Sequence, residues 1–406
     1  MLSKKGSILG ASLLVAGTCI GGGMLALPIV TGPYGFLPSF FLLLISWAFM
    51  TTTALLLAEA NLWMEEGVHI ITLASRLLGP VGKAIAWLLY LFIGYASLVA
   101  YAAGGGGLIT SATERFFGIA ISPSWAIVSF VLVLGAVIYF GNMIVGRVNT
   151  ILMLGLIGAY ILLIGRGVDY IKWHYLARSL WKNHLVALPM LLTVFSFQTI
   201  VPSLTLYLKQ DGKALRMSII IGTTITFFVY LIWQALVLGT VPLEGEYGLA
   251  HALMVGQGVT DYLAVSFGSS WIGMMTDFFA FFALVTSFLG IALGLFDFLS
   301  DGLKIHENRW GSIALGLLIV IPTLFFVLIM ERVFLIALDT SGGIGDAILN
   351  GIFPALMVWV GRYRKGYLSD FSLPLGKPML VFVMSYAVFV FLIEIAGKIG
   401  WMVSIG

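Results

Sequence analysis

Glycine residues and a proline interrupt an apolar run near the start of the chain, in the stretch AGTCIGGGMLALPIV (residues 16–30). Gly21, Gly22, Gly23 and Pro28 lie in a segment that is otherwise apolar enough to cross a membrane. Glycine weakens a helix and proline removes a hydrogen-bond donor. Within a membrane, backbone groups freed in this way are tolerated only where they line a cavity or meet protein. The pattern indicates either a packing surface of small residues or a break in the helix.

A second apolar run is interrupted in the middle of the chain, in ALPMLLTVFSFQTIVPSLTLYL (187–208). Its polar and helix-breaking residues are Ser196, Gln198, Thr199 and Pro202. By our count of spans the two interruptions lie five spans apart, and a unit of five spans must reappear upside down in the membrane. Two broken helices at matching places in two halves are typical of transporters built from inverted repeats. The presence of both interruptions therefore favours two broken helices over two packing surfaces of small residues.

The two ends of a broken helix attract opposite charges. A half-helix that starts near Met24 would direct its positive end at an anion, and one that ends near Gly17 would offer carbonyl groups to a cation. Together these ends suit the carboxylate and ammonium groups of an α-amino acid, and the glycines allow it to approach the backbone closely. The predicted substrate-binding residues are Gly17, Thr18, Gly21, Gly22, Gly23, Met24, Tyr101, Phe195, Ser196, Gln198 and Thr199.

Three of these residues suit an aromatic side chain. Tyr101 and Phe195 could stack on a ring, and the amide of Gln198 could meet a phenolic hydroxyl. A site that bonds this hydroxyl rejects a ligand that lacks it, because its own polar group is then left unpaired. The alternative is that either aromatic residue belongs to the core or faces lipid, as many of the 29 Phe, 15 Tyr and 11 Trp must.

The composition places these segments in a membrane. Of 406 residues 60% are hydrophobic and 10% are charged, with a mean hydropathy of +1.08. Soluble domains carry roughly 25% charged residues. The net charge of +3 is spread over loops and forms no basic stripe for nucleic acid, and Cys19 is the only cysteine. We predict an all-α integral membrane protein with no metal site of the cysteine-rich kind.

Apolar segments of about 20 residues follow one another along the chain, and eleven spans fit best. The chain then consists of a first set of five spans (1–165), a loop (166–184), a second, inverted set of five spans (185–360) and a segment with one extra span (361–406). The first helix of each set, helix one and helix six, is expected to be broken. The mixed stretch 250–267 is expected to lie on the surface as a short helix. The spans are expected near 6–31, 36–62, 83–111, 124–141, 147–165, 185–208, 214–240, 270–299, 310–330, 333–360 and 376–400.

The distribution of lysine and arginine favours a cytoplasmic N-terminus and an extracytoplasmic C-terminus, since most of these residues then lie inside. The loop 166–184 is discordant, because Arg166, Lys172, Arg178 and Lys182 would lie outside.

Four stretches resemble one family of transporters. They are GTCIGGGMLALP (17–28), LLLAEANLW (55–63), TSFLGIALGLFDFLSDGL (286–303) and GIFPALMVWVGRY (351–363). The chain resembles the hydroxy and aromatic amino acid permeases, the tyrosine permeases most and the tryptophan permeases next. These belong to the amino acid, polyamine and organocation superfamily, whose fold is of the leucine-transporter type.

The resemblance implies proton-driven uptake of an aromatic amino acid across the inner membrane, without a cofactor and without an evident obligate protein partner. It places the first break at Gly17–Met24 and the second at Phe195–Thr199. The chain departs from the family pattern in LDTSGGIGD (338–346), where Asp339 and Asp346 lie within the tenth span. These two acids leave the identity of the coupling group open.

Charged residues within a membrane are functional candidates because they are costly to bury. Glu59, Asp339 and Asp346 are therefore candidates for carrying a proton. In sodium-coupled relatives of this fold, adjacent hydroxyls on the eighth helix bind the ion, and Thr286 and Ser287 stand at that place. Hydroxyl and carbonyl oxygens are ligands that a hard cation prefers, although hydroxyls in a membrane helix also simply bond to their own backbone.

Other functions fit the sequence less well. The chain shows neither a repeated pore-loop filter nor a charged ring of the kind channels use. It contains no HExxH or GxSxG motif, and we expect no enzyme activity. A sodium-coupled or tryptophan-preferring symporter stays open as an alternative, as does an uncoupled facilitator or an amino acid sensor with the same site.

Overall fold

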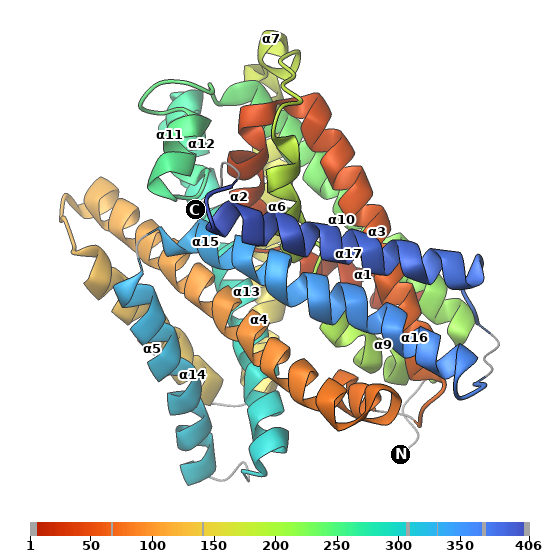
Figure 1. Ribbon diagram of the computed structural model, residues 1–406. Coiled ribbons are helices and arrows are strands. Elements are labelled where there is room, and N and C mark those ends of the chain that lie inside the picture. Colours follow the sequence, from red (N-terminus) through yellow and green to blue (C-terminus); the bar gives the residue numbers. More distant parts are fainter. Residues whose placement is uncertain are drawn as a thin grey trace.

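The structure is a computed structural model that describes residues 6–65, 68–139, 142–305, 309–330, 332–367 and 371–401. Every named element within these ranges is helical, as Figure 1 shows, so the predicted all-α class is confirmed. The longer helices are α1 (Ile8–Cys19), α2 (Gly23–Thr31), α3 (Phe36–Leu62), α4 (Ile70–Phe117), α5 (Pro123–Tyr139), α6 (Asn142–Gly167), α10 (Gly212–Thr240), α13 (Ser270–Leu303), α14 (Arg309–Ile329), α16 (Phe353–Tyr363) and α17 (Gly376–Lys398). The shorter ones are η1 (Gly32–Tyr34), η2 (Val168–Tyr170), α7 (Trp173–Leu176), η3 (His184–Ala187), α8 (Leu188–Val194), η4 (Gln198–Ile200), α9 (Val201–Tyr207), α11 (Leu249–Val255), α12 (Thr260–Phe267), α15 (Val333–Thr340) and η5 (Ser341–Ile352).

Nine helical segments of the described chain are long and apolar enough to cross a membrane, or ten if the bent pair α1 and α2 forms one span. The span predicted near 124–141 corresponds to α5, which has 17 residues and stands near the lower limit of about 17 for a membrane helix. The count of eleven and the division into inverted repeats stay predictions.

The third span differs from the prediction of 83–111, because its helix begins at Ile70. Gly79 interrupts this helix with a φ of 77°, and Pro80 follows it. A left-handed residue of this kind is accessible to glycine at little cost, and the residue before a proline avoids the helical conformation. The segment before Gly79 is a helical extension that the apolar run alone did not reveal.

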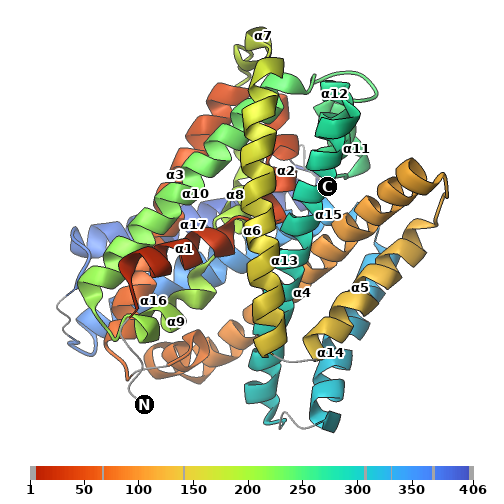
Figure 2. The ribbon, with the colours of Figure 1, turned by 180° about the vertical axis from the view of Figure 1, so that it is seen from behind.

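Two groups of helices face each other across the molecule. Helices α1, α3 and α10 pack together on one side, and α4, α5 and α14 pack together on the other. Figure 2 shows α1, α3 and α10 on one side of the view and α5 and α14 on the other, with α6 and α13 between them, while α4 crosses the lower part of the view to reach α5. Helix α13 contacts both α6 and α4, so it joins the middle of the molecule to the second group.

The first span is broken, as predicted. Helix α1 ends at Cys19, α2 begins at Gly23, and the two segments are bent by 59°. The break is narrower than the predicted Gly17–Met24. The amides of Met24 and Leu25 already bond to the carbonyls of Gly21 and Gly22, at 3.1 Å each, and so begin the new helix.

The sixth span is broken where the sequence predicts it. Helix α8 ends at Val194, a 3₁₀ turn occupies Gln198–Ile200, and α9 begins at Val201. Pro202 lies in the first turn of α9, a position where its missing N–H would in any case have no partner within the helix.

The stretch 250–267 forms two short helices, α11 and α12, and not the single surface helix that we predicted. Gly256 ends the first with a φ of 73°, a conformation that favours glycine. Leu249, Leu263 and Phe267 are buried, because the helices turn their apolar sides toward the bundle. The discordant loop 166–184 also has a structural role, since the Arg178 guanidinium donates to the carbonyls of Gly32 and Pro33 at the end of the first span.

The tenth span contains a 12-residue π-helical segment, η5, between α15 and α16. Such segments are rare and are frequently found at functional sites. Pro354 follows the segment, and it lacks the amide hydrogen that an α-helix would direct at the carbonyl of Asn350. The segment packs on α8, where a Cβ atom at Gly342 would lie 1.8 Å from the carbonyl oxygen of Pro189.

This contact predicts that Gly342→Ala lowers stability by about 2 kcal/mol or more, since overpacking a filled site costs roughly 1–3 kcal/mol and backbone cannot move aside as a side chain can. Gly158→Ala in α6 is the matched control, because no atom lies within 4 Å of a Cβ built there. The apparent Tm in detergent measures both. A Gly342→Ala protein that melts with the control would contradict the described packing.

Candidate functional site

The two breaks lie against each other. A Cβ atom at Gly23 would lie 3.1 Å from the side chain of Val194, the last residue of α8. The hydroxyl of Tyr230 in α10 donates to the carbonyl oxygen of Cys19 at 2.6 Å and to that of Val194 at 2.8 Å. One side chain thus joins the final carbonyl of α1 to the final carbonyl of α8.

The glycines of the first break make room for helices α13 and α4. The Gly22 amide donates to the Ser287 hydroxyl at 2.9 Å. A Cβ at Gly21 would lie only 2.1 Å from this hydroxyl oxygen, and a Cβ at Gly22 would lie 2.8 Å from the ring of Tyr101. The close approach that these contacts require explains why glycine occupies both positions.

Three predicted residues at the edges of the first break make other contacts. Gly17 and Thr18 lie in the last turn of α1: Gly17 packs toward Met153 of α6, and the Thr18 hydroxyl donates to the Leu14 carbonyl. Met24 is buried, and its carbonyl accepts a bond of 2.8 Å from the indole of Trp233. Their contacts with a substrate stay predictions.

At the second break, Phe195 is buried with its ring edge toward Tyr230, at 5.3 Å between ring centroids. The Gln198 amide is already engaged, since its nitrogen donates to the Met50 carbonyl and to the Thr53 hydroxyl at 3.2 Å each. Thr199 lies in the 3₁₀ turn η4. Phe195 therefore lies nearer to the junction of the breaks than Gln198, whose amide we expected to bond to a phenolic hydroxyl.

Asp346 lies in the π-helical segment and contacts the second break. Its Oδ1 accepts a bond of 2.7 Å from the Ser196 hydroxyl and one of 2.6 Å from the Asn350 amide. The side chain is fully buried, and its Oδ2 has no hydrogen-bond partner among the described residues. A buried carboxyl oxygen left unbonded is costly, so the group is a candidate for exchanging a proton.

Asp339 lies nearby on α15 but takes part in a different cluster. Its carboxyl neighbours Glu394 of α17, which forms an ion pair of 3.1 Å with Lys398. The Glu394 side chain lies against Gly343, where a Cβ would meet it at 2.5 Å. The cluster connects the tenth and eleventh spans, and among the described residues it has no hydrogen bond or ion pair with the first break.

Glu59 is held by a bidentate ion pair. Both carboxylate oxygens accept from the Arg362 guanidinium at 2.6 Å, and one also accepts from the Leu373 amide at 3.1 Å. Only 1% of the Glu59 side chain is exposed. Such a fully bonded carboxylate is suited to hold α3, α16 and the segment before α17 together. Both of its oxygens accept hydrogen bonds, so neither supports the predicted coupling role.

The hydroxyls predicted to hold sodium have other partners. Thr286 donates to the carbonyls of Phe282 and Ala283 in its own helix, at 2.7 and 3.2 Å. Ser287 accepts from Gly22, as described above. Thr286 therefore follows the simpler alternative, in which a hydroxyl bonds to the preceding turn of its own helix.

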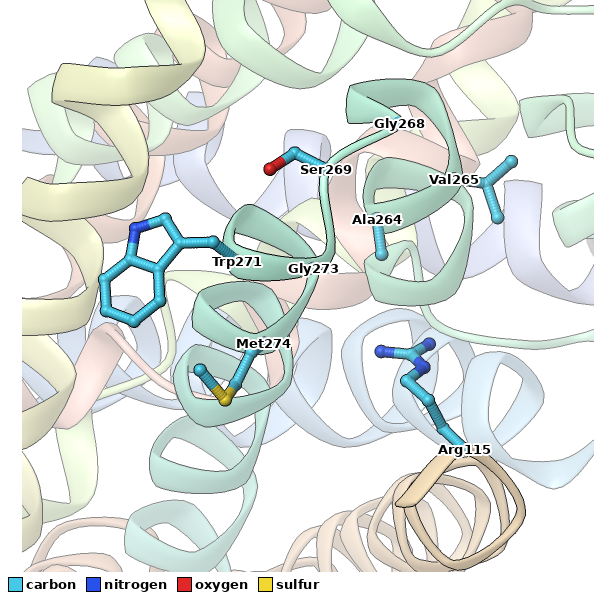
Figure 3. Close-up of a pocket in the computed structure, with 8 residues that line it drawn as sticks. All are labelled: Arg115, Ala264, Val265, Gly268, Ser269, Trp271, Gly273 and Met274. Carbon is cyan, nitrogen blue, oxygen red and sulfur yellow. The ribbon is translucent and has the colours of Figure 1, made fainter. Parts of the chain in front are cut away.

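A cavity of ≈ 620 Å³ opens away from the breaks, beside α12 and the start of α13 (Figure 3). Arg115 of α4 points toward α12 in this view, and it pairs with Asp277 of α13 and, at 3.6 Å, with Asp261 of α12. Burial raises the pKa of the Asp261 carboxyl, while the Ser111 hydroxyl and the charge of Arg115 lower it. The cluster fastens α12 to α4 and α13.

Comparison with known proteins identifies the family. Residues 4–394 match the tryptophan/tyrosine permease family. The chain belongs to this family. It is 33% identical over 399 residues to the tyrosine-specific transport system 1 of Haemophilus influenzae, which covers 97% of this chain and 98% of that protein. It is 30% identical over 420 residues to the tryptophan-specific transport protein of the same organism, with 99% and 98% covered.

The permease also shares its fold with a solved transporter. The crystal structure of MhsT in complex with L-phenylalanine superimposes with a TM-score of 0.65 at 14% identity, over 97% of this chain and 99% of that one. The predicted leucine-transporter type of fold is therefore confirmed. This family consists of transport proteins and not enzymes, and its members are multi-pass membrane proteins.

The sequence prediction missed three residues of the permease that hold the site together, Tyr230, Trp233 and Asn350, and also Arg362, the partner of Glu59. Two of them had a usable signal. Asn350 stands four residues after Asp346, and residues four apart share a helix face. Arg362 is a charged residue at the end of an apolar span, where a charge is expected to pair with an opposite one such as Glu59.

The Glu59 pair yields a stability prediction. Glu59→Ala leaves Arg362 and the Leu373 amide without their acceptor, and removing one partner of a buried pair costs about 3–5 kcal/mol. Glu65→Ala is the control, because Glu65 pairs with Arg76 at 3.7 Å with 82% of its side chain exposed, and such surface pairs contribute little. A large fall in the apparent Tm is expected for Glu59→Ala alone. Equal Tm values for the two variants would show that the pair does not hold these helices.

Proposed function

We propose that this permease is a secondary active transporter that imports an aromatic amino acid, most of all tyrosine, together with a proton. The observation that carries the proposal is the meeting of the two breaks, joined by Tyr230 between Cys19 and Val194. The names of the relatives support an aromatic substrate, since they are tryptophan-specific and tyrosine-specific transport proteins.

The arrangement supports binding of an amino acid at the first break. Helix α2 begins at Gly23 and directs its N-terminal end into the break, where the positive end of the helix dipole favours a carboxylate. The rings of Tyr101 and Phe195 lie on α4 and beside α8, next to this end. A side chain that stacks between them would be aromatic.

Asp346 is the proposed proton carrier. It bonds to Ser196 inside the second break, so a change in its charge would be felt where the substrate is expected to bind. A neutral carboxyl donates a hydrogen bond and a charged one only accepts. Protonation would thus rearrange its bonds with Ser196 and Asn350, and the conformational exchange that opens the site to either side would follow from this change.

Sodium coupling receives less support. The Thr286 hydroxyl is bonded within its own helix, and the Cys19 carbonyl is bonded to Tyr230. The predicted ligand Thr286 and the last carbonyl of α1 are thus engaged by protein groups. We further propose that the permease lies in the inner membrane with a cytoplasmic N-terminus and an extracytoplasmic C-terminus, in line with its distribution of basic residues.

Uptake into proteoliposomes tests the proposal. Purified permease is reconstituted, and labelled tyrosine is supplied with an inward proton gradient, an inward sodium gradient or neither, with tryptophan, phenylalanine and serine as competitors. We expect accumulation with protons alone, competition by the aromatic amino acids and none by serine. Accumulation that needs sodium would contradict proton coupling, and absence of uptake for every aromatic amino acid would contradict the substrate class.

Replacement of the proposed proton carrier gives a second test. Asp346→Asn removes the titratable group and keeps its size, so we expect it to abolish accumulation driven by a proton gradient while exchange of labelled for unlabelled tyrosine continues. Asp169→Asn is the control, because Asp169 is exposed in the turn after α6. Undiminished accumulation by the Asp346→Asn permease would assign the proton to another group.

A further inference from the structure

Tyr230 lies at a position that its surroundings define closely. Its side chain is fully buried, and its single hydroxyl hydrogen is shared by two carbonyl oxygens, those of Cys19 and Val194. These are the final residues of α1 and α8. The last carbonyl groups of a helix have no partner within that helix and must find one elsewhere when they are buried.

The ends of two half-helices attract positive charge. Each helix carries the equivalent of roughly half a negative charge at its C-terminal end. In transporters with broken helices, such ends and unwound carbonyls are where a coupling cation binds. Here the positive end of an O–H bond occupies the point at which the two ends meet, so a neutral side chain supplies what a cation would otherwise supply.

The rest of α10 holds this side chain in place. Trp233 donates to the Met24 carbonyl at 2.8 Å, and Gln234 donates to the Thr31 hydroxyl at 2.5 Å. Tyr230 and Gln234 stand four residues apart and Trp233 lies between them, so all three share one helix face. This face bonds to both halves of the first span, and the ring of Phe195 packs against Tyr230 from the sixth.

We propose that Tyr230 is a positioning residue which holds the two half-helix ends together with a hydroxyl hydrogen in the place of a bound cation, so that these carbonyls bind no sodium. The inference rests on the proposed transport function and deepens it, because it names the hydroxyl group that would take the place of sodium at this point. Removal of that hydroxyl would leave two buried carbonyl oxygens facing a space open to a hard cation.

Tyr230→Phe tests the proposal, since it removes the hydroxyl and keeps the ring that packs on Phe195. Tyr160→Phe is the matched control: the Tyr160 hydroxyl also donates to a backbone carbonyl, that of Val229 at 2.9 Å, but among the described residues it has no hydrogen bond to Cys19 or Val194. Initial rates of tyrosine uptake by the purified full-length proteins are measured at equal proton gradients, in sodium chloride or in choline chloride.

For Tyr230→Phe we expect a KM for tyrosine raised at least about tenfold in choline, corresponding to about 1.4 kcal/mol, and lowered again by sodium. The wild type and Tyr160→Phe should show the same KM in both salts. A Tyr230→Phe protein with unchanged KM, or with a loss that sodium does not reduce, would overturn the proposal, because a purely structural role would not respond to sodium.

A stability measurement keeps the inference testable when Tyr230→Phe folds poorly or when the wild type transports no aromatic amino acid. The variant is extracted and melted in sodium or in choline throughout. We expect sodium to raise the yield and apparent Tm of Tyr230→Phe and to leave those of the wild type unchanged. Equal values in the two salts for both proteins would overturn the inference independently of the transport result.

Discussion

A helix that is interrupted inside a membrane needs replacements for the hydrogen bonds that its backbone has lost, because lipid supplies none. In this permease the replacements come from helices far along the chain. Ser287 receives the amide of Gly22, and the Tyr230 hydroxyl serves the carbonyls of Cys19 and Val194. The break can exist only while α10 and α13 stay in contact with it, so a movement of either helix changes the site directly.

The same dependence extends from the second break to the tenth span. Ser196 bonds to Asp346, and Gly342 lets the π-helical segment approach the backbone of α8. A titratable group is thereby attached to one of the two elements that form the proposed site. The Glu59–Arg362 pair holds the far end of the same span to α3, so the span is fixed at this end and bonded to the break in its middle.

The sequence predicted the two breaks because glycine, proline and polar residues are conspicuous in an apolar run, and the resemblance predicted the fold. The contacts of α10 were not predictable in this way. Tyr230 and Trp233 are two aromatic residues among many in the chain, and only the packing of α10 on α1 and α8 selects them. The π-helical segment was not predicted for a similar reason, since its residues favour no particular helix type. Gln198 lies at the second break, but its amide is bonded to α3, and its contact with a substrate stays a prediction.

Cys19 offers the most direct test of the central claim, that the substrate binds where the two breaks meet. It is the only cysteine of the chain, and its buried side chain lies at the end of α1 beside the first break. A reagent therefore reaches the thiol only while the proposed site is open. The rate of its alkylation is measured in proteoliposomes with saturating tyrosine, tryptophan or serine. The control is a double variant, Cys19→Ser with Gly158→Cys, whose single cysteine lies in α6. The account predicts that the aromatic amino acids slow the alkylation of Cys19 alone and that serine does not. An unchanged rate under conditions in which tyrosine is transported would contradict it.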